Sequence, residues 1–206
     1  MNARPLASAL ALVFVGCDET SPSLDATVPP DGLANNGAWA AIAGATCNAE
    51  ERNVATQESP HVDPSAGPIA WITNPPSSGP HYPTWARWGA WPAVPRGYWV
   101  HSLEHGGVAY LYRCPMGACD ATRDSLVAMM NTIPTDRACM PSDASPARVR
   151  AVVTPDNEIA TPIAAAAWGW LYRAECVDAA SLRSSYVRHA GMAPEGRSQP
   201  LVATWR

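Results

Sequence analysis

Hydrophobic and polar positions follow a regular pattern in the second half of the chain. Apolar residues at helical spacing predict one helix over residues 122–133 and another over residues 179–190. Short apolar runs predict strands over residues 108–112, 149–153 and 163–171. The order strand, helix, strand, strand, helix favours the α+β class, with a small, mostly antiparallel sheet and two or three helices.

Residues 60–97 lack such a pattern. They are dense in proline, glycine and tryptophan, and the stretch NPPSSGPHYPTWARWGAWPAVPRG alone holds six prolines, which argues against a helix. A long irregular segment inside a compact domain is usually either functional or disordered. The tryptophans Trp85, Trp88 and Trp91 indicate that this segment is packed.

The chain begins with a pattern typical of export. Arg4 precedes an apolar run over residues 6–15, which has the size of a signal-peptide core and is too short to span a bilayer. The run ends at Gly16-Cys17, which resembles the lipobox of bacterial lipoproteins, where the cysteine is lipidated. We therefore predict a signal peptide over residues 1–16, with ordinary secretory cleavage as the alternative to lipidation of Cys17.

The composition changes again after the signal peptide. Residues 17–36 are polar and rich in proline, which predicts a lipid-anchored flexible tether. Residues 37–206 have a globular composition and are expected to form a single globular domain. No later stretch is long and apolar enough to cross a membrane. The protein is thus expected to be exported and attached to the cell envelope through its N-terminal lipid only.

Five further cysteines accompany Cys17, and in an exported protein cysteines predict disulfides. They are Cys47, Cys114, Cys119, Cys139 and Cys176. Cys114 and Cys119 flank the turn-like spacer Pro-Met-Gly-Ala and are the favoured local pair. The number is odd, so one thiol is left over if Cys17 carries lipid. A soft metal site that combines Cys114, Cys119 or Cys139 with Met116 or Met140 is the alternative.

The charge of the chain bears on its partners. It has 14 basic residues, all of them arginine, against 18 acidic residues, for a net charge of −4. A mildly acidic domain without a basic stripe is a poor match for nucleic acid, which we exclude as an expected partner.

Residues 101–105 spell H-x-x-E-H, the pattern of the inverted zinc peptidases. Such an enzyme needs the motif on a helix and takes a third ligand from a downstream glutamate, for which Glu175 is available. However, Pro92 and Pro95 precede the motif and Gly106-Gly107 follow it. We therefore expect an extended segment, on which residues four apart point to the same face.

Two other histidines lie in proline-restricted turns upstream. His81 follows Ser-Gly-Pro and His61 follows Ser-Pro, so that four of the five histidines lie between residues 61 and 105. We predict a shared metal site, with Glu104 as a further ligand or as an outer partner of an imidazole. The predicted ligands are His61, His81, His101, Glu104 and His105. Taken singly, each histidine could instead cap a loop or stack on a tryptophan, and His189 is expected at the surface.

Three stretches of the chain resemble a known family. They are NPPSSGPHYPTWARWGAW, VHSLEHGGVAYLYR and ATPIAAAAWGWLYRAECVDAASLRSSYVRHAGMAPE, and together they resemble the bacterial domain-of-unknown-function family numbered 3105. The resemblance extends from about His61 to Glu195 and implies an exported or membrane-anchored domain. It implies no activity, and the extra cysteines of this chain depart from the pattern. The five predicted ligands all match motif positions of that family.

Three functions are compatible with these residues. The leading hypothesis is a cell-envelope lipoprotein domain that binds copper or zinc, because neutral imidazoles suit these ions. The second is a metal-dependent enzyme that uses the same histidines, with Glu104 as general base. The third is a non-enzymatic interaction domain, in which Trp85, Trp88, Trp91 and Trp99 form an aromatic surface for a protein or glycan partner.

Overall fold

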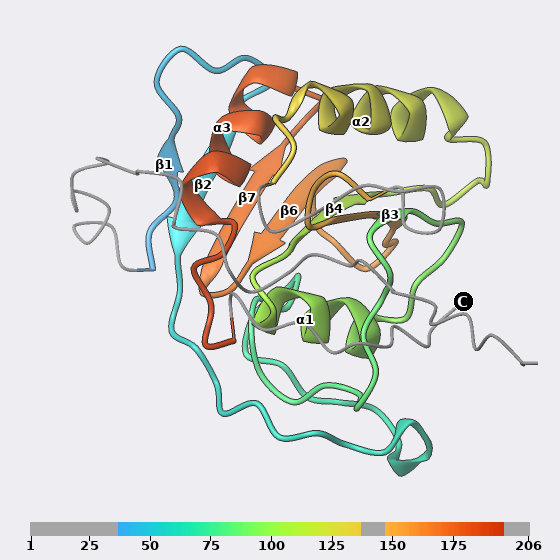
Figure 1. Cartoon of the computed structure of the whole chain (residues 1–206). Coiled ribbons are helices and arrows are strands. Elements are labelled where there is room, and N and C mark those ends of the chain that lie inside the picture. Colours follow the sequence, from blue (N-terminus) through green and yellow to red (C-terminus); the bar gives the residue numbers. More distant parts are fainter. Residues whose placement is uncertain (1–36, 137–146, 196–206) are drawn as a thin grey trace, which may run out of the picture.

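A seven-stranded sheet forms the centre of the computed structural model, which describes residues 37–136 and 147–195 (Figure 1). The strand order across the sheet is β1-β2-β7-β6-β4-β5-β3. The strands are β1 (Ala40–Ala41), β2 (Glu50–Asn53), β3 (Gly89–Ala90), β4 (Val108–Tyr112), β5 (Ala151–Pro155), β6 (Ile163–Ala167) and β7 (Trp170–Ala174).

The sheet is mixed, with antiparallel pairing predominating. Every pairing from β1 through β2, β7 and β6 to β4 is antiparallel, whereas β5 pairs in parallel with both β4 and β3. The predicted α+β class and the mostly antiparallel sheet are confirmed, but the sheet is not small. The strand predicted over residues 163–171 is in fact a hairpin, because Gly169, with φ of +72°, turns the chain between β6 and β7.

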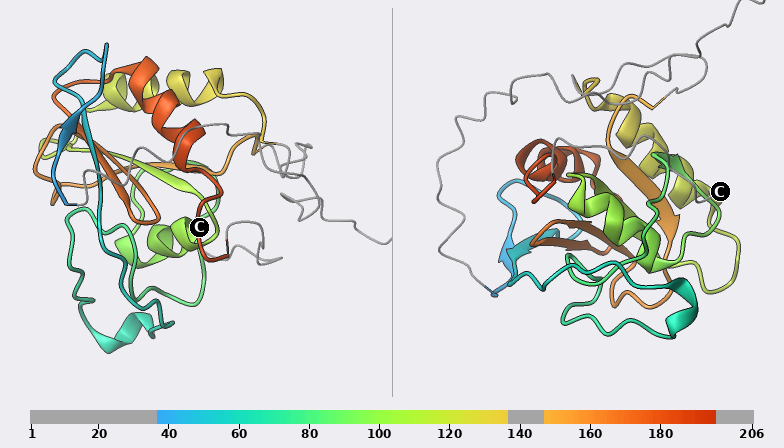
Figure 2. Two further views of the ribbon diagram at one scale, coloured as in Figure 1. Left: turned by 90° about the vertical axis from the view of Figure 1, so that its left-hand side faces the viewer. Right: turned by 60° about the horizontal axis from the view of Figure 1, so that its bottom comes forward.

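Three α-helices cover the two faces of the sheet. They are α1 (Arg96–Glu104), α2 (Asp120–Thr132) and α3 (Ala179–His189), and a short 3₁₀ helix, η2, spans Pro64–Ala66. Helices α2 and α3 lie on one face of the sheet, and α1 lies with the proline-rich segment on the other (Figures 1 and 2). The predicted helices over residues 122–133 and 179–190 correspond to α2 and α3, whereas α1 was not expected.

The central strand β4 shows how both faces are filled. Val108, Tyr110 and Tyr112 pack in a core with residues of α2 and α3, whereas Ala109 and Leu111 pack in a second core with residues of α1. All five residues are buried. A strand covered on both faces has apolar residues at every position, which explains the continuous run in the sequence.

The H-x-x-E-H segment is helical, so the expectation of an extended segment is wrong. His101 and Glu104 lie in α1, and His105 is its C-terminal cap. The helix ends in a Schellman motif, in which the N–H of Gly107 donates to Ser102 O and the N–H of Gly106 donates to Leu103 O, both at 2.9 Å. Gly106 has φ of +74°, a conformation that favours glycine. The glycines therefore terminate this helix and do not exclude it.

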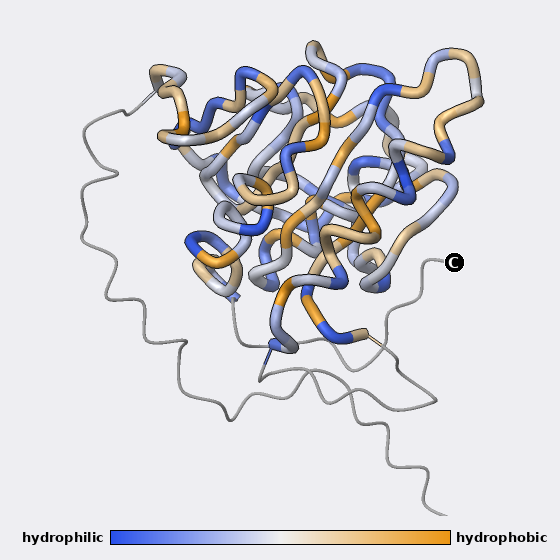
Figure 3. The backbone as a smooth tube through the Cα atoms, turned by 90° about the horizontal axis from the view of Figure 1, so that it is seen from above, coloured by the Kyte–Doolittle hydropathy of each residue, from blue (hydrophilic) through white to orange (hydrophobic). Residues whose placement is uncertain are grey.

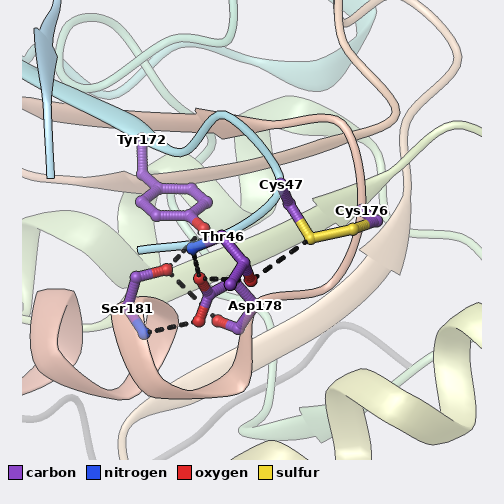
Figure 4. Close-up of a disulfide and its surroundings, with 6 residues drawn as sticks. All are labelled: Thr46, Cys47, Tyr172, Cys176, Asp178 and Ser181. Carbon is purple, nitrogen blue, oxygen red and sulfur yellow. Dashed lines mark hydrogen bonds between the residues drawn. A yellow bond between two sulfur atoms is a disulfide. The ribbon is translucent and has the colours of Figure 1, made fainter. Parts of the chain in front are cut away.

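Two disulfides join segments of the described chain: Cys47 to Cys176, and Cys114 to Cys119. The favoured local pair is thus confirmed, and both bonds are consistent with an oxidising, exported environment. The bond between Cys47 and Cys176 links the turn after β1 to the connection between β7 and α3, next to Thr46 and Asp178 (Figure 4). Cys139, Cys17, the predicted signal peptide and the predicted tether lie outside the described residues.

Hydrophobic and hydrophilic residues are interspersed along the backbone (Figure 3). Within residues 37–136 and 147–195, none of the helices combines the length and apolar character needed to cross a membrane.

His189 lies in a buried polar cluster and not at the surface as expected. Its Nε2 lies 2.9 Å from Glu51 Oε1, and its ring stacks on Trp170 with ring centroids 4.2 Å apart. Ser185 and Arg188 of the same helix also donate to the Glu51 carboxylate, at 2.8 and 2.6 Å. The cluster joins the end of α3 to strand β2 at the edge of the sheet.

This cluster predicts acid sensitivity. Burial alone would raise the pKa of Glu51, but His189, Arg188 and Ser185 outweigh it and lower the pKa from 4.5 to about 2. Because the folded-state pKa is depressed, the carboxylate stabilises the fold above pH 4.5, and this contribution is lost as the pH falls towards 2. We therefore expect Glu51→Gln to be less stable than wild type at pH 7 and to approach it at pH 2.

Urea denaturation across this pH range measures the effect. Glu175→Gln, which removes an exposed carboxylate, is the control and should follow wild type. A constant difference between Glu51→Gln and wild type at every pH would contradict the electrostatic origin.

Candidate metal site

Four of the predicted ligands come together on the α1 side of the sheet. His61, His81, His101 and Glu104 each offer one ligand atom, and these atoms all lie within 4.8 Å of one another. His81, His101 and Glu104 are buried, whereas His61 is exposed. The group is therefore set into the protein with one ligand at the solvent side, which gives an ion a route of entry.

The main chain brings His61 and His81 together. The two residues form an isolated parallel β-bridge, in which the N–H of Val62 donates to His81 O at 2.8 Å and the N–H of His81 donates to Pro60 O at 3.2 Å. Their ring centroids lie 5.1 Å apart. Two turns of the proline-rich segment are thus fixed against each other where their histidines meet.

A backbone carbonyl orients the His81 ring. His81 Nδ1 lies 2.9 Å from Gly79 O, so it carries the proton and donates it to this carbonyl. In the neutral ring, Nε2 then carries a lone pair, and it lies 3.0 Å from Glu104 Oε2 without the geometry of a hydrogen bond. Two acceptors that face each other at this distance repel unless a proton or a cation lies between them.

His101 is held in the same way. Its Nδ1 lies 2.7 Å from Tyr82 O and donates to it, which leaves the lone pair on Nε2, 3.0 Å from His105 Nε2. The carbonyl is positioned because Tyr82 packs against the start of α1 and donates its N–H to Gly97 O at 3.1 Å. A Cβ at Gly97 would lie 2.6 Å from the Tyr82 ring, so only glycine permits this approach.

The electrostatic environment favours the metal-binding forms of His101 and Glu104. Burial, together with the neighbouring histidines, lowers the pKa of His101 from 6.5 to about 4. Burial would raise the pKa of Glu104, but the charge of a protonated His81 and the Ser59 hydroxyl, which donates at 2.5 Å, lower it to about 2. Near pH 7, His101 is therefore neutral and Glu104 is ionised, as metal ligands must be.

His105 lies beside this group. Its Nε2 is 3.0 Å from His101 Nε2, and the two rings are stacked. On its other side, Nδ1 lies 3.7 Å from Glu195 Oε2. Glu104, His105 and Glu195 form a second group of ligand atoms within 4.8 Å of one another. Glu195 was not predicted from the sequence, because nothing in its local pattern indicates that the chain returns to α1.

Glu175 and two of the tryptophans lie elsewhere than the alternative hypotheses require. Glu175, the downstream glutamate of the peptidase hypothesis, follows β7 next to the disulfide cysteine Cys176 and belongs to neither group of ligand atoms. Trp85 and Trp99 are buried, with exposed fractions of 5% and 0%. They pack inside the protein and cannot contribute to the aromatic surface that the interaction-domain hypothesis requires.

The comparisons with known proteins agree with the resemblance seen in the sequence. A family model described as "Protein of unknown function (DUF3105)" matches residues 61–200, which include both groups of ligand atoms. No curated protein and no solved structure matches the chain. Because the match covers most of the sequence, the chain belongs to the DUF3105 family.

Proposed function

We propose that this protein is an exported, envelope-anchored domain that holds a copper or zinc ion between His61, His81, His101 and Glu104. The observation that carries the proposal is the orientation of the buried imidazoles. His81 and His101 each donate Nδ1–H to a backbone carbonyl, which turns His81 Nε2 towards the Glu104 carboxylate and His101 Nε2 towards His105, with the His61 and His81 rings beside it. This outer bond to Nδ1 is typical of metal-ligating histidines.

The donor set indicates the kind of ion. Three imidazoles and one carboxylate suit zinc or copper and differ from the oxygen-rich sites of calcium or magnesium. Atoms that share one zinc ion lie roughly 3.4 Å apart, because each lies about 2 Å from the metal. The 3.0 Å between His81 and Glu104 is close to this value, and the exposed His61 can adjust without displacing packed neighbours.

The disulfides support the cellular part of the proposal. They favour an oxidising compartment, and the apolar run before Cys17 would direct the chain there. Lipidation of Cys17 would then hold the domain at a membrane surface, so that the site samples ions outside the cytoplasm.

The test is a calorimetric titration of tag-free, chelator-treated protein with Zn²⁺ and with Cu²⁺. We expect a tight first binding step with one ion per chain. We expect His61→Ala to weaken the affinity of this step at least tenfold, because one of the metal ligands is lost. His61 is exposed, so this substitution leaves the packing intact. His189→Gln removes a histidine that belongs to neither group of ligand atoms and should bind the ions as wild type does. Absence of a tight step in wild type, or equal affinity in His61→Ala, would refute the proposal.

A further inference from the structure

We propose that a second divalent cation binds beside the first, between Glu104, His105 and Glu195, with Glu104 as a ligand shared by both ions. This inference rests on the proposed function of the first group. Each of the three residues offers one ligand atom, and the atoms lie within 4.8 Å of one another. Glu104 and His105 are buried, and the side chain of Glu195 is 53% exposed.

The backbone sets Glu195 in this position. The N–H of Glu195 donates to Glu104 O at 3.1 Å, and the N–H of Gly191 donates to Gly106 O at 2.8 Å. Carbonyls at the C-terminal end of a helix lack intrahelical partners, and the segment that follows α3 supplies them here. The carboxylate is therefore brought over His105 by two main-chain bonds at the end of α1.

Glu104 has the capacity to serve two ions. A carboxylate offers about four lone pairs. In Glu104, Oε1 accepts the Ser59 hydroxyl and Oε2 faces His81, which leaves further lone pairs on both oxygens. Because Glu104 belongs to both groups, the two ions would be close neighbours, as in two-metal sites, where the separation is about 3.5–4 Å.

The second group differs from the first in its donor atoms. Two carboxylates and one imidazole form a harder donor set than three imidazoles and one carboxylate, which suits Zn²⁺ or Mn²⁺ and disfavours Cu⁺. Three protein ligands also leave a coordination position for water, as in catalytic zinc sites. The second ion is therefore expected to be the weaker and more exchangeable of the two.

Zinc titration of Glu195→Gln tests this inference. In wild type we expect two steps and two zinc ions per chain. In Glu195→Gln we expect one ion per chain, with the affinity of the first step changed less than threefold, because Gln keeps the main-chain bonds and removes only the charged ligand. Glu175→Gln, which removes an exposed carboxylate elsewhere, should keep both steps. Protein loaded with two equivalents of Co²⁺ should show magnetic coupling between the ions in wild type.

The outcomes separate this inference from the proposed function. One zinc ion in wild type whose affinity depends on His61 would refute the second site and leave the first intact. Two ions that persist in Glu195→Gln, or two Co²⁺ ions without magnetic coupling, would place the second ion elsewhere and also refute it. No tight step in wild type would refute both.

Discussion

Replacement of Cys47 and Cys176 by serine is expected to lower the free energy of unfolding by roughly 5 kcal/mol, whereas replacement of Cys114 and Cys119 should cost roughly 2 kcal/mol. The difference arises because the first bond closes a loop with a sequence separation of 129 residues, and the second closes one of 5 residues. A longer closed loop removes more conformational entropy from the unfolded chain.

Hydrogen bonds beside the Cys47–Cys176 disulfide hold the same two segments together in the folded protein, so its removal should act mainly on the unfolded chain. Asp178 accepts from the N–H and the hydroxyl of Thr46, and the N–H of Glu175 donates to Cys47 O, so the two segments remain joined when the sulfur atoms are removed (Figure 4). Denaturant unfolding of the two double-serine variants measures both costs, and each variant is the control for the other. Equal costs would contradict an origin in the unfolded chain.

Glu104→Gln is expected to weaken the binding of the first metal ion at least 100-fold. The substitution removes the charge of the carboxylate that faces His81 Nε2 and leaves a neutral amide, which is a poor ligand. His81→Ala should cause a similar loss, although His81 lies 20 positions before His101, because each substitution removes one ligand from the same ion. Isothermal titration with Zn²⁺ measures both effects, with Glu175→Gln and His189→Gln as controls.

The same variants, assayed for hydrolytic activity as well as for zinc affinity, separate binding from catalysis. If Glu104 is a general base beside a metal bound by His101 and His105, Glu104→Gln would abolish hydrolytic activity and keep zinc affinity unchanged. Losses confined to His101→Ala and His105→Ala, with His81→Ala unaffected, would restrict the site to the H-x-x-E-H motif. Either result would contradict the four-ligand site.

The site residues were predictable from the sequence, but their local structure was not. The histidines stood out by their concentration in the proline-rich segment. Helix α1 escaped prediction because it is buried between the sheet and this segment, so its apolar residues do not fall on one side. Pro95 and Gly106 argue against a helix when the sequence is considered alone, although proline at a start and glycine at an end are typical of a helix.

Other features depend on contacts between residues far apart in the sequence. His189 is expected at the surface from its position on the predicted last helix, but it contacts Glu51, which is 138 residues away. Glu195 reaches Glu104 through main-chain hydrogen bonds, which leave no trace in a side-chain pattern. The strands β1 and β3 are two residues long, too short for any alternation to be recognised.

With the proposed ion bound, the bridge between His61 and His81 would make metal supply a determinant of conformation. It joins two stretches that have little regular secondary structure, where the N–H of Gln57 also donates to Ser78 Oγ at 3.0 Å, and an ion would add a further link between them. An ion that binds only the closed arrangement adds to its stability by mass action, about 2.7 kcal/mol at a free concentration 100 times the Kd. In a compartment that contains proteases, the lifetime of this protein would then follow the local abundance of the ion.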